Sequence, residues 1–172
     1  SVVKIKKDST LSLVAFKNDI SNIINFDFQK FILKNIEQSS SKGLELRYQW
    51  EYRPINGRLL LRYQDPRDQM GRQLFRRSKK SMSLNVYRDF AIGSLNLNLS
   101  AFDKRNDFGG IVLPRYSLLN LSFFKEISNQ LGLSIRLENI LDKEYYTASG
   151  FNAYYRNQGR SLWLNTTYKL KH

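Results

Sequence analysis

The sequence predicts an all-β protein, an antiparallel up-and-down transmembrane β-barrel to which this chain contributes about nine strands. Three observations support this fold class. Side-chain character alternates with a period of two, short and long connections follow one another, and several alternating segments are long enough to cross a bilayer. No segment shows the 3.6-residue period of a helix.

The alternation is clearest in Leu44–Arg53, where apolar or aromatic residues hold every second position and polar or charged residues hold those between. Ser94–Ser100 and Leu131–Glu138 show the same pattern. The other predicted strands are Val2–Lys6, Leu11–Phe28, Arg58–Asp65, Ser81–Phe90, Tyr116–Glu126 and Leu162–Leu170.

The predicted connections alternate in length. Short turns are expected at Lys7–Thr10, Pro54–Gly57, Ala91–Gly93 and Ser128–Gln130, with Asn56–Gly57 as a hairpin signal. Long polar connections are expected at Gln29–Ser41, Pro66–Lys79, Asp103–Pro114 and Asn152–Gln158. Outer-membrane barrels have this asymmetry, with tight periplasmic turns and extended extracellular loops.

A soluble β-sandwich would show the same alternation, so strand length and aromatic placement decide between the two. Several segments reach the 9–11 residues that a tilted bilayer strand needs, and Tyr48, Trp50, Tyr63 and Tyr168 lie toward the ends of the apolar stripes. Aromatic girdles at the two interfaces are typical of membrane barrels. These features favour the barrel.

Composition excludes several function classes. The 172 residues contain no cysteine and a single histidine, His172, which argues against disulfide scaffolds, thiol catalysis, a Ser/His/Asp triad and a two-histidine metal site. No phosphate-binding glycine loop is present. The chain has 28 Lys+Arg against 15 Asp+Glu, a net charge of +13, but these charges are scattered over strands and loops. We therefore expect no enzyme, cofactor, metal or nucleic-acid partner.

The C-terminal third resembles a known family. Leu137–Tyr145 (LENILDKEY) is similar to the signature of the second-to-last strand in TonB-dependent outer-membrane receptors, and Gly159–Trp163 (GRSLW) resembles their closing stretch. Phe16–Ile24, Lys42–Leu46 and Gly71–Arg77 resemble upstream strand motifs of the same family. Order and spacing are most similar to the vitamin B12 receptor branch.

The resemblance implies a TonB-driven importer of a large scarce nutrient, cobalamin or a ferric siderophore, in the outer membrane of a Gram-negative bacterium. Such a receptor holds a plug inside a barrel of about 22 strands. Residues 1–172 would be its C-terminal barrel part, since no stretch resembles a plug or TonB box. The expected partners are outer-membrane lipid and lipopolysaccharide, the plug and remaining strands from the same or a separate chain, and indirectly TonB.

Strand parity predicts a polar wall facing the lumen, formed by Glu45, Arg47, Gln49, Glu51, Asn96, Asn98, Arg136 and Glu138, that pairs its own charges. The resemblance makes Arg76 the first ligand candidate, although Arg76, Arg77, Lys79 and Lys80 would also form a basic girdle facing lipopolysaccharide phosphates. It also places Phe151 toward a ligand, and Asn152, Tyr154, Tyr155 and Arg156 complete the predicted ligand-binding set. Asp103–Asp107 and Asp65–Asp68 are interpreted as solvated loops.

Two alternatives stay open. One is a small autonomous outer-membrane barrel, self-closed, with a structural or adhesive role. The other is a soluble basic β-sandwich that binds polyanions.

Overall fold

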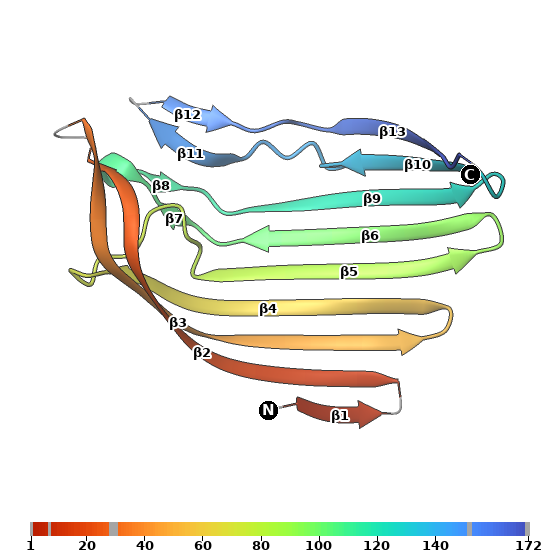
Figure 1. The fold of residues 1–172 in the computed structure, drawn as a ribbon, viewed down its shortest axis with the longest axis horizontal. Helices are drawn as coiled ribbons and strands as arrows, with labels where there is room; N and C mark the ends of the chain where they lie inside the picture. Colours follow the sequence, from red (N-terminus) through yellow and green to blue (C-terminus); the bar gives the residue numbers. More distant parts are fainter. Residues whose placement is uncertain (1, 7, 28–30, 151–152, 171–172) are drawn as a thin grey trace.

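The computed structural model of the protein describes residues 2–6, 8–27, 31–150 and 153–170. Nine of its strands form one antiparallel sheet in the order β1-β2-β3-β4-β5-β6-β9-β10-β13 (Figure 1). They are β1 (Val2–Lys6), β2 (Ser9–Asp27), β3 (Ile32–Tyr52), β4 (Ile55–Asp68), β5 (Lys80–Phe90), β6 (Gly93–Phe102), β9 (Tyr116–Glu126), β10 (Leu131–Glu138) and β13 (Ser161–Tyr168).

Two small hairpins stand on the connections of this sheet. β7 (Arg105–Asn106) pairs with β8 (Val112–Leu113) between β6 and β9, with the 3-10 turn η1 (Phe108–Gly110) at its tip. β11 (Tyr146–Gly150) pairs with β12 (Ala153–Arg156) between β10 and β13. Both hairpins lie at one end of the sheet, and the tight turns lie at the other (Figure 1). This confirms the predicted asymmetry of the connections.

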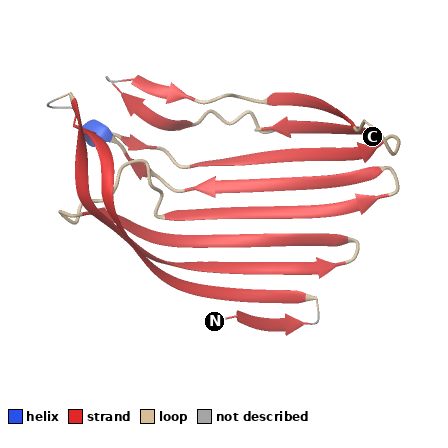
Figure 2. Ribbon diagram, in the orientation of Figure 1, coloured by secondary structure: helices blue, strands red, loops and turns tan. Residues whose placement is uncertain are grey.

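In the part of the chain that the structure describes, the sheet is a single layer without a covering layer of helices or strands (Figure 2). Among the described residues, Leu113 is the only buried apolar side chain, whereas Leu44, Leu61, Leu162 and Leu164 are exposed. A soluble sandwich must bury one face of each sheet against the other. The single exposed layer therefore argues against the sandwich. The described residues also include no helix long and apolar enough to cross a membrane.

The two faces of the sheet differ in chemistry, as the alternation predicted. The apolar face is marked by one row of directly paired residues that crosses six strands: Leu13, Leu46, Leu61, Met82, Ala101 and Ser117. The polar face carries rows such as Glu45, Arg62 and Ser81, and Arg58, Asn85, Asn98 and Asn120. Every strand pair is in the register that keeps polar and apolar side chains on separate faces of the sheet. A shift of one residue would move all side chains of a strand to the opposite face.

The sheet does not close on itself within the described residues. β1 pairs with β2 alone and β13 with β10 alone, and Figure 1 shows these two strands at opposite edges of the sheet. A self-closed barrel, one of the two alternatives from the sequence, is therefore not what these nine strands form.

Several predicted connections are wrong in extent. Most of Gln29–Ser41 belongs to β3, which pairs with β2 as far as Asp27 and Ile32, because backbone bonding continues through the polar serine run. Asn152–Gln158 contains β12, and Asp103–Pro114 contains β7 and β8. These segments mix polar and apolar residues without the strict alternation that marks a half-buried strand.

The hairpin predicted at Pro54–Gly57 forms between β3 and β4, but its turn consists of Arg53 and Pro54, and Asn56 and Gly57 belong to β4. Gly57 pairs with Trp50, and a Cβ at this position would lie 2.1 Å from the Trp50 ring. Glycine is needed here because the indole lies over its backbone, an arrangement known to compensate for a glycine in a strand.

Candidate functional site: the polar wall and the loop end

Ion pairs hold the polar face together on its β3–β4 side. Glu45 accepts from Arg47 at 2.8 Å and from Arg62 at 2.7 Å. On β10, Arg136 pairs with Glu138 at 3.1 Å, and the Trp163 indole N–H donates to Glu138 at 3.1 Å. The predicted wall thus pairs its own charges at Glu45 and Glu138, whereas Glu51, on the same wall, forms no ion pair with a described residue.

An asparagine ladder, formed by Asn85, Asn98, Asn120 and the backbone of Asn139, crosses the centre of the polar face. Asn98 Nδ2 donates to Asn85 Oδ1 at 2.9 Å, and Asn120 Nδ2 donates to Asn98 Oδ1 at 3.4 Å. The Asn139 N–H donates to Asn120 Oδ1 at 2.8 Å, which fixes the orientation of the Asn120 amide because a backbone N–H can only donate. Asn98 was predicted as part of the polar wall, but the sequence pattern does not connect it to Asn85 and Asn120.

The LENILDKEY motif forms the turn that joins this ladder to the C-terminal strands. Asn139 Oδ1 accepts the Lys143 N–H at 2.9 Å, and Asn139 Nδ2 donates to the Lys143 carbonyl at 2.9 Å. Asp142 accepts the Arg160 N–H at 2.8 Å, and a Cβ on Gly159 would lie 2.8 Å from the same carboxylate oxygen. Asn139 and Asp142 adopt positive φ angles of 49° and 51°, which asparagine and aspartate tolerate best after glycine. The motif therefore has a structural role here.

At the loop end, one carboxylate joins three connections. Asp107 Oδ1 accepts the Phe108 N–H and Arg76 Nε, each at 2.9 Å. Asp107 Oδ2 accepts the Ser149 N–H at 2.6 Å and the Ser149 hydroxyl at 2.9 Å. Arg76 Nη2 also donates to the Ser149 carbonyl at 3.1 Å, and its guanidinium lies 5.2 Å from the centre of the Phe108 ring. We call Arg76, Asp107 and Ser149 the loop clasp.

Asp107 is fully buried within the clasp, at 0% exposure. Burial alone raises the pKa of this carboxyl, but the N–H groups of Phe108 and Ser149, the Arg76 guanidinium and the Ser149 hydroxyl outweigh it and hold the pKa below its ordinary value. The group is therefore ionised at neutral pH.

The solvated-loop interpretation of Asp103–Asp107 is wrong for two of its residues. Asp107 and Arg105 are both buried. Ser149, which covers Asp107, lies 42 positions away in sequence, so no local pattern could reveal the contact. Arg105 donates to the carbonyls of Pro114 at 3.2 Å and Tyr146 at 2.8 Å.

Aromatic rings surround Arg105 at the loop end. Its guanidinium lies 4.7 Å from the centre of the Tyr116 ring, a cation–π distance. Tyr116 in turn contacts Tyr145 at 4.7 Å and Phe102 at 5.1 Å between ring centres. Sequence reasoning missed this group, because its members come from four separate segments.

The structure distributes the predicted ligand-binding set over two places. Arg76 lies in the loop clasp, where its side chain is 41% exposed and binds Asp107. Tyr154, Tyr155 and Arg156 lie on β12 and are exposed, with Arg156 3.6 Å from Glu144 and the Tyr154 ring 5.0 Å from that of Tyr146. Phe151 and Asn152 lie outside the described residues.

No group of three or more acidic or histidine side chains that could hold a metal ion occurs among the residues described. The site offers ion pairs, amide groups and aromatic rings for binding.

Comparison with known proteins identifies the architecture. The family described as "TonB dependent receptor-like, beta-barrel" matches residues 3–140. The chain belongs to this family. Proteins of the family are located in the outer membrane of Gram-negative bacteria, so the apolar face of this TonB-dependent receptor chain is its lipid face.

Curated relatives and solved structures agree with the family assignment. The chain is 26% identical over 166 residues to the vitamin B12 transporter BtuB of Vibrio vulnificus, covering 92% of this chain and 27% of that protein. It is 28% identical over 160 residues to BtuB of Vibrio cholerae, covering 86% and 26%. The chain thus spans about a quarter of the length of these relatives.

The fold is similar to solved receptors at low identity. The ferric yersiniabactin uptake receptor FyuA from Yersinia pestis superposes with a TM-score of 0.73 at 19% identity, covering 95% of this chain and 28% of that one. The copper transporter OprC gives a TM-score of 0.75 at 13% identity, covering 95% and 29%. The predicted fold class and family are confirmed.

Proposed function

We propose that residues 1–172 form the C-terminal part of the barrel of a TonB-dependent receptor that imports a large scarce nutrient across the outer membrane. The observation that carries the proposal is the open sheet. Strand edges with unsatisfied backbone groups cannot persist in hydrocarbon, so β1 and β13 need further strands beside them. Those strands, and a plug that TonB acts on, would come from the same or a separate chain.

Cobalamin and a ferric siderophore are the two substrate classes we propose. Sequence identity of 26% and 28% to proteins named vitamin B12 transporters supports cobalamin. The net charge of +13 supports an anionic ferric siderophore, because long-range positive potential raises the encounter rate of an anion. We expect the receptor to have no catalytic activity toward either substrate class.

The loop end is the proposed ligand-binding surface, with Arg76 and the β11–β12 hairpin, Phe151 and Asn152 included, as its candidates. Two exposed tyrosines on β12, Tyr154 and Tyr155, offer ring faces to a bulky ligand. The loop clasp would hold the connections that carry these residues in one arrangement, which lowers the entropy cost of binding.

Uptake of radiolabelled cyanocobalamin and of ⁵⁵Fe-siderophore by the source organism tests the proposal. Deleting the gene that encodes the chain should abolish uptake of one of the two, and the complete gene on a plasmid should restore it. Deletion of the TonB energising complex should abolish the same uptake. Unchanged uptake of every substrate after gene deletion would contradict a transport role.

A further inference from the structure

The polar face changes character between its flanks and its centre. The flanks, β3 with β4 on one side and β10 on the other, carry the ion pairs of Glu45 and Glu138. The central strands β5, β6 and β9 present three successive rows of uncharged side chains on this face. These rows are Ser83, Asn85 and Tyr87 of β5 and the residues paired with them in register on β6 and β9. We call these three rows the amide lane.

The amide lane offers hydrogen-bonding groups that its own contacts do not use up. Asn85, Asn98 and Asn120 each donate one hydrogen bond to a neighbouring side chain, and a carboxamide has two N–H groups. In the next row toward the turn end, the Asn96 side chain forms no hydrogen bond with a described residue. Because neighbouring strands are about 4.8 Å apart, the lane presents uncharged donors and acceptors at short, regular steps.

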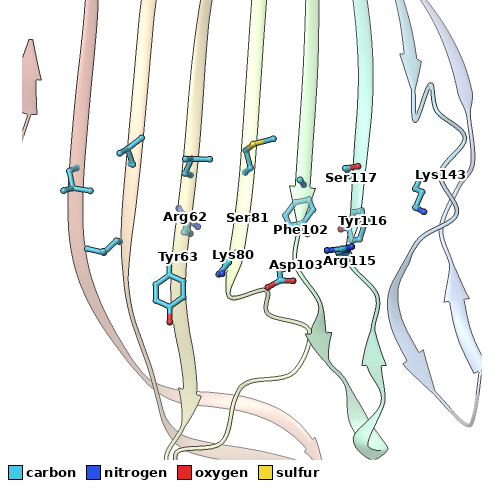
Figure 3. A pocket seen from close by; sticks show the side chains of 16 residues that line it. Arg62, Tyr63, Lys80, Ser81, Phe102, Asp103, Arg115, Tyr116, Ser117 and Lys143 are labelled. Atoms are coloured by element: carbon cyan, nitrogen blue, oxygen red, sulfur yellow. The ribbon is translucent and has the colours of Figure 1, made fainter. Parts of the chain in front are cut away.

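The two ends of the lane differ. On the loop side, the next residues of this face on β6 and β9 are Phe102 and Tyr116, whose rings lie side by side with their centres 5.1 Å apart (Figure 3). On the turn side, the next residue of β5 is Asp89, which accepts hydrogen bonds from the hydroxyl groups of Tyr87 at 2.5 Å and Ser94 at 2.6 Å. The lane therefore runs along the strands from an aromatic end to a carboxylate end.

The flanks and the lane would hold a plug differently. Ion pairs across an interface bind more strongly than hydrogen bonds between uncharged groups, which exchange readily with water. On the β3–β4 flank, Glu51 and Arg58 are exposed and form no ion pair with a described residue, so both can pair with charges of a plug. A plug would therefore be held at the flanks and would separate from the wall most easily along the lane.

We propose that the amide lane is the surface along which the nutrient crosses the barrel, and that it suits an uncharged ligand rich in amide and hydroxyl groups, the cobalamin class. Passage requires binding that is repeated over many sites and weak at each one, which neutral amides provide. An anionic siderophore would lose hydration along the lane without meeting a cation. The proposal rests on the proposed transport function and chooses between its two substrate classes.

The test changes one lane residue after the receptor has assembled, so that folding is not affected. This chain contains no cysteine, and Asn96→Cys therefore introduces a single thiol into the full-length receptor once any cysteine outside this chain is replaced by serine. Cells that are taking up radiolabelled cyanocobalamin are treated with methanethiosulfonates that attach a sulfonatoethyl, a trimethylammonioethyl or a hydroxyethyl group. Uptake is compared with that of the same variant without reagent.

Either charged group should reduce uptake about tenfold, since an unpaired charge in the lane costs at least as much as one lost hydrogen bond to a charged group. The uncharged hydroxyethyl group should have little effect. Binding of cyanocobalamin to cells that lack the TonB energising complex measures the loop end alone and should not change with any reagent.

The matched control is Asn56→Cys. Asn56 lies in the same cross-strand row as Asn96, joined to it through Tyr87, but on the β4 flank. Both asparagines are half-buried, and neither side chain forms a hydrogen bond with a described residue. None of the three reagents should reduce uptake by the Asn56→Cys receptor.

Four results would overturn the proposal. An Asn96→Cys thiol that stays unreactive throughout energised uptake would mean that the plug covers the lane at all times. Equal loss with charged and uncharged groups would mean that size alone matters. Equal loss in Asn56→Cys would mean that the lane is not distinct from its flank. Loss of siderophore uptake instead of cobalamin uptake after gene deletion would leave the transport function intact and exclude the neutral lane. Only unchanged uptake of every substrate after gene deletion removes the transport function itself.

Discussion

Replacing Asp107 by asparagine should release the loop end from the sheet. All four groups around the carboxylate donate to it, and three of them, the N–H groups of Phe108 and Ser149 and Arg76 Nε, can only donate. An asparagine carries an NH₂ in place of one acceptor. The least damaging arrangement places this NH₂ group beside Ser149. The Ser149 hydroxyl can then rotate and accept a hydrogen bond from it, but the Ser149 N–H loses its acceptor.

The magnitude follows from these contacts. Losing one hydrogen bond to a charged group costs about 1.5–3 kcal/mol, and changing the two that remain on Oδ1 from charged to neutral acceptors costs about 1 kcal/mol each. The exposure of Arg76 reduces its share through solvent screening. The total is about 3–5 kcal/mol, or an opening equilibrium raised more than about 100-fold.

Hydrogen–deuterium exchange of the detergent-purified receptor measures this opening directly. In Asp107→Asn, amides in residues 103–114 and 146–150 should exchange faster together, because the clasp joins both segments. The matched control is Asp103→Asn, whose carboxylate accepts the Lys104 N–H at 2.9 Å, a bond that an amide oxygen can replace. Unchanged exchange of both segments in Asp107→Asn would refute the role of the clasp.

The clasp also has a predictable dependence on pH. Because the pKa of Asp107 lies below its ordinary value of 3.8 when the clasp is formed, the opened state takes up the proton first as the pH falls. The stabilisation is therefore complete above the ordinary pKa and is lost as the pH falls through the lower pKa of the formed clasp. Exchange protection of residues 146–150, corrected for intrinsic rates, should stay constant from pH 7 down to about pH 4 and decrease below it.

Three further predictions concern other parts of the chain. Gly57→Ala should lower the free energy of unfolding of the assembled barrel by about 1–3 kcal/mol, because the new Cβ overlaps the Trp50 ring. The urea midpoint, followed by heat-modifiable gel migration, should fall with it, and an unchanged midpoint would contradict this. Asn120→Ala should cost about 1–3 kcal/mol in the same assay, since it leaves the buried backbone N–H after β10 without its acceptor. Tyr155→Ala should weaken binding of the imported nutrient, measured by equilibrium dialysis, whereas Tyr168→Ala, equally exposed but at the turn end, should not; equal effects would exclude the β12 surface as the ligand site.

The strands were predictable wherever the two faces of the sheet meet different environments. Leu131–Glu138 and Tyr116–Glu126 were predicted with the bounds that the structure has, because lipid on one side and polar groups on the other impose strict alternation. The distal part of β3 was missed because its residues, from Ile32 to Gln38, pair with β2 beyond the end of β4. There, backbone hydrogen bonds and not the side-chain pattern define the strand.

The candidate site was less predictable, because its contacts join distant segments. In the sequence, Asp107 is one charged residue within a polar loop. Only the fold brings Ser149 and Arg76 into hydrogen-bonding distance of its carboxylate. The LENILDKEY motif was visible as a resemblance, but its function as a turn required the contacts of Asn139 and Asp142.

The asparagine ladder gives the polar face an electrical direction. Its four hydrogen bonds run from Asn139 through Asn120 and Asn98 to Asn85 and on to Ser83, and each amide donates toward β5. The amide dipoles therefore add head to tail around the wall. Hydrogen bonds in such a chain polarise one another and strengthen by roughly 10–30% each. An amide removed at any one position should weaken its neighbours, so the ladder behaves as one unit spread over three strands and the turn after β10.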